Sequence, residues 1–233
     1  MHAKKIRPRG QGRRAPGNAC LKGRSPLFFA MPHPQRTRIL IAADIFGVTP
    51  ELGQLARALG ANGTLAKPQP YSRSFRSEAA AYASFVEHGG VAAYARQLGA
   101  LLTGRDFCFE LALGFSAEAS ALWVCLADAN LEPRLPKRAE LYYGSRIRQH
   151  ADIAPRRQAR LCFAEHETSF DAPALVEQLR RLGHNAHVLP GSRHGFMNPR
   201  SARFDETLAA RETDRLQALL EVGPEAVQAR RRR

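Results

Sequence analysis

Short apolar segments alternate with longer helical segments along this chain, and no other feature limits its fold as strongly. Residues 38–43 (RILIAA) have the length and apolar character of a buried strand. A helical pattern over 51–59 follows, with leucines three and four positions apart, and Gly60 ends it. Repetition of this order predicts an α/β protein in which helices cover both faces of a mainly parallel central sheet. We expect strands at 38–43, 63–66, 107–113, 140–143, 160–164 and 187–189, and helices at 51–59, 77–88, 90–102, 117–127, 172–182 and 204–220.

Basic residues are concentrated at the two ends of the chain. Of the 35 lysines and arginines, ten lie in residues 1–38, which contain no aspartate or glutamate, and four form a C-terminal run of arginines. The stretch between them is electrically neutral, so the net charge of +14 belongs to the ends. This pattern predicts one neutral domain at 38–221, between a disordered basic extension (1–37) and a basic tail (222–233), with Met31 as an alternative start. Binding of nucleic acid by the domain is not expected.

The sequence contains no indication of a membrane span, a metal site or a nucleotide cofactor. Its apolar runs are all shorter than the roughly 18 residues of a spanning helix. Its four cysteines have no CxxC spacing, and the glycine patterns of dinucleotide and phosphate loops are absent. We therefore expect a cytoplasmic monomer or homodimer without metal or cofactor. If residues 1–30 are translated, their arginine-rich, acid-free composition resembles an organellar transit peptide, which would change the compartment.

Ser116 follows the expected strand 107–113, at the centre of the sequence GFSAE. This sequence is close to the G-x-S-x-G nucleophile elbow. In that motif a serine on a tight strand-to-helix turn exposes its hydroxyl, and the next backbone N–H points at a developing oxyanion. Glu118 stands where the motif has its second glycine. A serine at the start of a helix is also a common N-cap, so the motif alone leaves both interpretations open.

A serine nucleophile needs a base and an acid, and in this motif's usual chain order both follow it. His194 lies in the sequence GSRHGF, after the expected strand 187–189. Carboxylates follow the preceding strand at Glu165, Glu167 and Asp171. Sites in parallel sheets lie at the carboxyl ends of the strands, so the serine, one of these acids and the histidine are expected to meet there.

Four blocks of the sequence resemble the corresponding blocks of the dienelactone hydrolase family, in the family's order and at similar intervals. They are 43–48 (ADIFGV), 114–117 (GFSA), 142–147 (YYGSRI) and 194–199 (HGFMNP). The resemblance covers about residues 39–220. It implies a single α/β-hydrolase domain that cleaves a small-molecule ester or lactone with a nucleophile, an acid and a histidine.

The same resemblance implies roles for individual residues. Ser116 would be the nucleophile that forms the acyl-enzyme, His194 the base, and Glu167 the acid that orients the histidine. Asp171 stays an alternative acid, although its position at the start of a helix is also typical of an N-cap. The sequence-level hypothesis is therefore a serine hydrolase with a Ser-Glu-His triad.

Backbone groups and a further carboxylate are implied beside the triad. The N–H groups of Ile45 and Ala117 correspond to the family's oxyanion hole. Asp44 stands where the classical enzymes have a glutamate that contacts the nucleophile in the resting state.

Two departures from the family's pattern affect the expected substrate. The classical enzymes hold a substrate carboxylate with arginines, one of them shortly after the histidine, where this chain has Asn198. Arg146 and Arg193 are the basic residues expected to bias the pocket toward an anion. Glu118 is expected either to face the substrate or to distort the elbow. The alternative interpretation is a catalytically silent α/β-hydrolase-fold protein that binds a small molecule or a partner.

Overall fold

The computed structural model describes residues 37–60, 62–66, 75 and 77–221. The expected N-terminal extension, apart from its last residue, and the expected C-terminal tail lie outside the described residues. No helix among those described is long and apolar enough to cross a bilayer.

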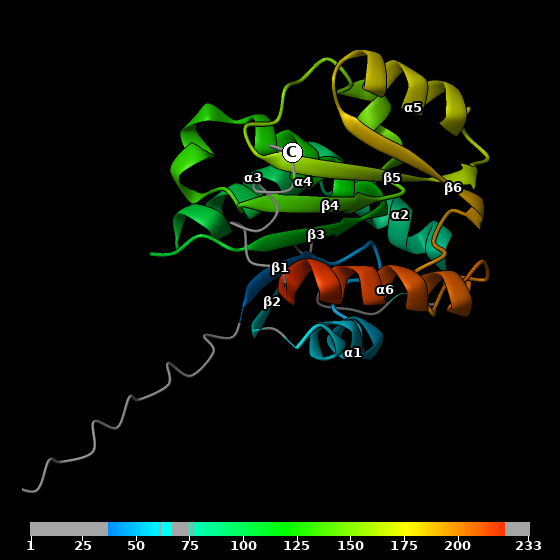
Figure 1. The fold of residues 1–233 in the computed structure, drawn as a ribbon, viewed down its shortest axis with the longest axis horizontal. Helices are drawn as coiled ribbons and strands as arrows, with labels where there is room; N and C mark the ends of the chain where they lie inside the picture. Colours follow the sequence, from blue (N-terminus) through cyan, green and yellow to red (C-terminus); the bar gives the residue numbers. More distant parts are fainter. Residues whose placement is uncertain (1–36, 61, 67–74, 76, 222–233) are drawn as a thin grey trace, which may run out of the picture. The chain divides into compact units, whose positions relative to one another are not determined.

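The described strands form one parallel sheet in the order β2-β1-β3-β4-β5-β6 (Figure 1). The first strand, β1, lies next to the edge strand β2, and the chain then crosses from β2 to the other side of β1, where it forms β3. The strand order therefore reverses between β1 and β3, and this is where parallel α/β sheets form their sites. The strands are β1 (Arg38–Ala42), β2 (Asn62–Ala66), β3 (Leu111–Phe115), β4 (Arg138–Tyr142), β5 (Gln158–His166) and β6 (Asn185–Arg193).

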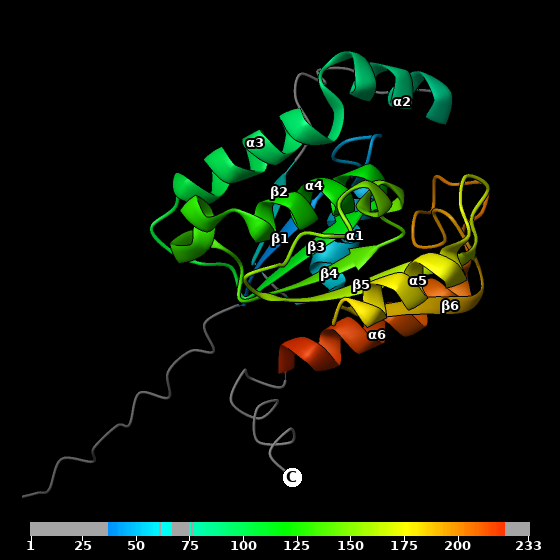
Figure 2. The ribbon, with the colours of Figure 1, turned by 90° about the horizontal axis from the view of Figure 1, so that it is seen from above.

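Helices cover both faces of the sheet, which confirms the predicted α/β fold class (Figure 2). Side chains alternate along β1, so that Leu40 packs on one face while Ile39 and Ile41 pack on the other. The face of Leu40 is covered by α2 (Glu78–Glu87), α3 (Gly90–Thr103), α4 (Ser116–Ala127) and α5 (Ala172–Arg181), and the opposite face by α1 (Pro50–Ala58) and α6 (Glu206–Glu221).

Strand β3 occupies 111–115, not the predicted 107–113. It pairs with β1 from Leu111 opposite Ile39, and because β1 begins only one residue earlier, 107–109 lie before the first residue of β1 in this register. Phe107 instead packs under the guanidinium of Arg38, whose central carbon lies 4.1 Å from the centroid of the Phe107 ring. The shift carries β3 directly into α4, with no loop between them.

Strands β5 and β6 are longer than predicted and reach His166 and Arg193. Their pairing passes an irregularity after Ala164 and ends with His166 opposite Arg193. Such bulges are common next to active sites, where they change the direction of a side chain. The extension places Glu167 and His194 immediately after two paired residues on adjacent strands.

Candidate active site

Ser116 has the backbone geometry of a nucleophile elbow. Its φ is +55°, a left-handed conformation that is uncommon for a residue other than glycine. It is the first helical residue of α4, and the N-cap is Phe115 in an extended conformation, so the interpretation of Ser116 as an N-cap is wrong. Strain of this kind is maintained where the surrounding structure fixes it, and it is found often at functional sites.

A close approach between β3 and α4 accounts for the glycine before the serine. A Cβ atom built on Gly114 would lie 2.8 Å from the Cα of Ala119, closer than real Cβ contacts. Both residues are therefore small because strand and helix touch there. Residue 118 lies elsewhere on the helix, which explains why the elbow tolerates a glutamate in place of the motif's second glycine.

Ser116, His194 and Glu167 form a continuous hydrogen-bonded chain. The Oγ of Ser116 lies 2.9 Å from Nε2 of His194, and Nδ1 of His194 lies 2.9 and 3.0 Å from the two carboxyl oxygens of Glu167. A carboxylate only accepts, so Nδ1 carries the imidazole proton, and Nε2 is left to accept the serine hydroxyl proton. The Glu167 side chain is 3% exposed and that of His194 is 17% exposed. The acid end of this hydrogen-bonded chain is therefore closed to solvent.

The other acids considered after β5 have different partners. An Asp171 carboxyl oxygen accepts the backbone N–H of Ala174 at 2.9 Å and caps α5. A Glu165 carboxyl oxygen accepts the backbone N–H of Gly191 at 2.7 Å. Only Glu167 of the three acids hydrogen-bonds to His194.

The loop after β1 brings backbone N–H groups to the serine. Phe46 N–H donates to an Asp44 carboxyl oxygen at 3.0 Å, and Gly47 N–H donates to the Asp44 carbonyl at 2.7 Å. The N–H of Ile45, the residue before Phe46, has no acceptor among the described residues. The Ala117 N–H belongs to the first turn of α4, where backbone donors have no partner within the helix. Ile45 and Ser116 line the same space, so the N–H groups of Ile45 and Ala117 are candidate donors there.

Asp44 lies at the base of this loop but does not bind the nucleophile. Its second carboxyl oxygen accepts a hydrogen bond from the side-chain amide of Asn198. Burial raises the pKa of Asp44 from its ordinary value of 3.8 to about 6, although the hydrogen bonds from Phe46 and Asn198 oppose the rise. The implied resting contact between this position and Ser116 is therefore replaced by a contact with Asn198.

Glu118 is completely buried beneath the elbow, so the expectation that it faces the substrate is wrong. Neither of its carboxyl oxygens has a hydrogen-bond partner among the described residues. Burial, and secondarily the charge of Asp44, raises the pKa of Glu118 well above its ordinary value. The left-handed conformation of Ser116 is retained above it, so Glu118 does not abolish the elbow either.

Of the two arginines expected to attract an anion, one contacts a tyrosine and the other is exposed to solvent. Arg146 donates to the hydroxyl of Tyr82 on α2 and lies over its ring. Arg193 is exposed at the end of β6. Neither lines the two spaces described next.

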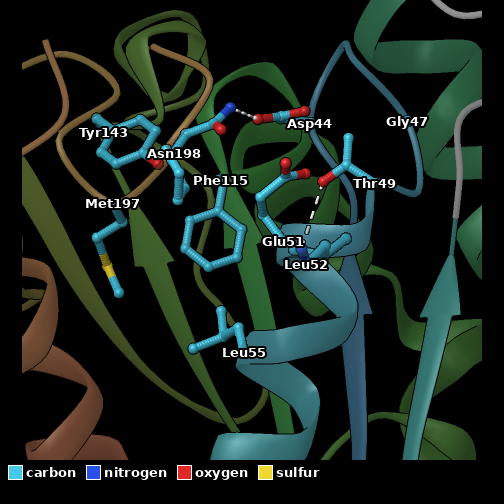
Figure 3. A pocket seen from close by; sticks show the side chains of 11 residues that line it. Asp44, Gly47, Thr49, Glu51, Leu52, Leu55, Phe115, Tyr143, Met197 and Asn198 are labelled. Atoms are coloured by element: carbon cyan, nitrogen blue, oxygen red, sulfur yellow. Dashed lines mark hydrogen bonds between the residues drawn. The ribbon is translucent and has the colours of Figure 1, made fainter.

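Two adjoining spaces open beside the loop after β1. We call the first the catalytic pocket, because Ser116 and His194 line it. We call the second the side chamber; Leu52 and Leu55 of α1 contribute to its wall (Figure 3). Within the part of the chain that the structure describes, no three His, Cys, Asp or Glu side chains are placed to hold a metal ion. Asp44, Tyr143 and Asn198 line both spaces.

Tyr143 and Asn198 had no predicted role at the site. The ring centroids of Tyr143 and His194 lie 5.0 Å apart, and the backbone of Tyr143 has a positive φ of 40°. At position 198 the sequence shows only that an asparagine stands where the classical enzymes have an arginine. The sequence signal for both was their membership of the blocks YYGSRI and HGFMNP, which carried the family resemblance.

Comparison with known proteins supports the fold. No protein-family model matches the sequence. A Bacillus subtilis (strain 168) protein, the uncharacterized protein YczH, is 25% identical over 179 residues, covering 73% of this chain and 85% of that protein.

Solved structures give the clearest likeness. A Klebsiella pneumoniae protein assigned as a dienelactone hydrolase superposes with a TM-score of 0.63 at 18% identity, over 80% of this chain and 87% of that one. A cold-adapted esterase from an Arctic intertidal metagenomic library gives 0.52 at 16% identity, over 79% and 82%. The chain therefore has the α/β-hydrolase fold.

Proposed function

We propose that this α/β-hydrolase-fold protein is a serine hydrolase that cleaves a carboxylic ester or lactone through an acyl-enzyme. The observation that carries the proposal is the hydrogen-bonded chain from Ser116 through His194 to Glu167, which starts at a strained elbow. The similar structures named as a dienelactone hydrolase and an esterase add support. The serine, histidine and acid follow β3, β6 and β5, and this placement supports the proposal because triads are recognised by geometry and roles rather than by sequence position.

Acylation uses the proton positions derived above. The hydroxyl oxygen of Ser116 attacks the substrate carbonyl carbon while its proton passes to Nε2 of His194. The carbonyl oxygen becomes an oxyanion and accepts hydrogen bonds from the N–H groups of Ile45 and Ala117, with the N-terminal dipole of α4 adding favourable potential. The bond to the leaving oxygen then breaks, and that oxygen takes the proton from Nε2.

Deacylation repeats these steps with water. A water molecule gives a proton to Nε2 of His194 as its oxygen attacks the acyl carbon, and the same N–H groups hold the second oxyanion. The bond to Ser116 Oγ breaks, and the serine recovers its proton from the imidazolium. Glu167 keeps the ring oriented and stabilises its positive charge in both halves of the cycle.

The proposal is tested with p-nitrophenyl acetate and two serine variants. Ser116→Ala is expected to lower kcat by roughly 10³-fold or more, because removal of a triad nucleophile leaves only binding and oxyanion stabilisation. Ser120→Ala is the matched control, since Ser120 is a buried serine one turn further along α4. A Ser116→Ala variant with more than about a tenth of the parental kcat would overturn the proposal.

A further inference from the structure

The side chamber is apolar at one end and polar at the other. Figure 3 shows Leu55, Phe115 and Met197 around its lower part, while Asp44 and Asn198 meet at its upper end. Phe115 directly precedes the nucleophile, so the chamber begins next to the reacting serine. An apolar space with a few polar groups at its entrance is typical of a site for a small organic group.

The position of His194 determines which half of an ester can enter this chamber. The leaving oxygen must take its proton from Nε2 of His194, so the alcohol half lies on the histidine side. His194 lines the catalytic pocket but not the side chamber. The acyl half points away from the leaving oxygen, and the space on that side, beyond Asp44 and Tyr143, is the side chamber.

The chamber's size limits the acyl group. The volume that the centres of water-sized groups can occupy is about 40 Å³ in the side chamber and about 20 Å³ in the catalytic pocket. One water needs roughly 10–15 Å³ by this measure, so the chamber accommodates about three atoms of that size. By this measure an acyl chain of four carbons fills the chamber, and one of eight extends beyond it.

Charge limits the acyl group further. Among the described residues that line the two spaces, Asp44, Glu51 and Glu78 are acidic, and none is lysine or arginine. Glu51 pairs with Arg200 at 3.1 Å, which offsets one negative charge. Asp44, which lines both spaces, has no ion-pair partner among the described residues, so a carboxylate on the acyl group would meet a like charge in a partly desolvated space.

From this arrangement we infer that the side chamber is the acyl-binding site and that the enzyme selects short, uncharged acyl groups over long or anionic ones. The inference rests on the proposed function, because it assigns the acyl half from the proton-donating role of His194. It reverses the expectation of an anionic substrate that the arginines in the sequence had suggested.

Acyl length is tested with p-nitrophenyl esters from acetate to octanoate. We expect kcat/KM to fall roughly tenfold or more between the butyrate and the octanoate, since even one misfitting methylene costs about that factor. Leu55→Ala enlarges the chamber and should shift the preference toward longer chains. Leu59→Ala is the matched control: this leucine, at the end of the same helix, is buried but does not line the chamber. If the active Leu55→Ala variant keeps the parental length preference, the chamber assignment is overturned.

Acyl charge is tested with p-nitrophenyl butyrate and the mono-p-nitrophenyl ester of succinate, which match in length and differ by one carboxylate. After subtraction of the uncatalysed rate, kcat/KM for the succinate should be lower by roughly tenfold, and less so at high salt. Glu51→Gln removes a carboxylate from the chamber wall and leaves Arg200 without this partner, so it should narrow the ratio, whereas Glu87→Gln, at the far end of α2, should leave it unchanged. Equal kcat/KM for the two esters would overturn the charge selection.

The two proposals fail in distinguishable ways. If the parental protein hydrolyses none of these esters, the proposed function is wrong and the acyl assignment falls with it. If it hydrolyses all of them in a Ser116-dependent manner, with no preference for length or charge, the proposed function stands and only the acyl assignment is overturned.

Discussion

Replacement of Asp44 by asparagine should make the protein relatively more stable as the pH rises. Burial raises the pKa of Asp44 to about 6 in the folded protein, against 3.8 ordinarily. The folded state therefore holds a proton that the unfolded chain releases between these values. The stability that this proton contributes is fully present below pH 3.8 and is lost as the pH rises through about 6. Asparagine does not titrate, so it removes this dependence.

The size of the effect follows from the two pKa values. The difference between 3.8 and about 6 corresponds to up to about 3 kcal/mol of unfolding free energy at a pH above both values. Between pH 4 and pH 7.5 the parental protein should lose about 2 kcal/mol relative to Asp44→Asn. The variant also exchanges one acceptor facing Asn198 for a donor, which adds an offset that does not vary with pH in this range.

Urea denaturation of both proteins at several pH values measures this difference directly. Groups that titrate equally in both proteins cancel when the two free energies are subtracted. Unfolding does not require the catalytic reaction, so the measurement does not depend on a substrate. Parallel free-energy curves across pH 4 to 7.5 would refute the reasoning, because they would mean that Asp44 keeps an ordinary pKa in the fold.

Three further changes test other parts of the structure. Glu167→Gln should lower kcat for p-nitrophenyl acetate by roughly 10³- to 10⁴-fold through loss of the imidazole tautomer, while Glu165→Gln should have little effect on kcat. Glu118→Gln should stabilise the protein increasingly as the pH rises above the ordinary glutamate pKa, seen by urea denaturation, because the raised pKa of the buried acid lowers stability with rising pH. Gly114→Ala should lower the unfolding free energy by about 1–3 kcal/mol, since the new Cβ meets the backbone of Ala119; an unchanged urea midpoint would contradict that contact.

The order of strands and helices could be predicted because it depends on local patterns. Apolar runs such as Ile39 to Ala42 and the leucine spacing of α1 are readable in isolation. Strand ends were harder, because they depend on partners. The start of β3 depends on where β1 begins, and the extension of β5 and β6 depends on their pairing with each other.

The positions of the reactive side chains were predictable for a similar reason. Ser116 and His194 follow strands of one parallel sheet, which requires no knowledge of packing. The surroundings of the site could not be predicted in this way, because they depend on packing between segments that are distant in the sequence. The burial of Glu118 follows from its side of α4, and the contact between Asp44 and Asn198 joins residues 154 positions apart. The signs of charge around the pocket could not be read from neighbouring arginines in the sequence.

Covalent labelling of the purified protein with a fluorophosphonate, followed by peptide mapping, tests the central claim most directly. The probe phosphonylates an activated serine, so it reports the nucleophile, its competence and its position together. We predict one adduct, on the peptide that contains Ser116, and none in the Ser116→Ala variant. Full labelling of that variant, or an adduct on another serine of the parental protein, would contradict the account.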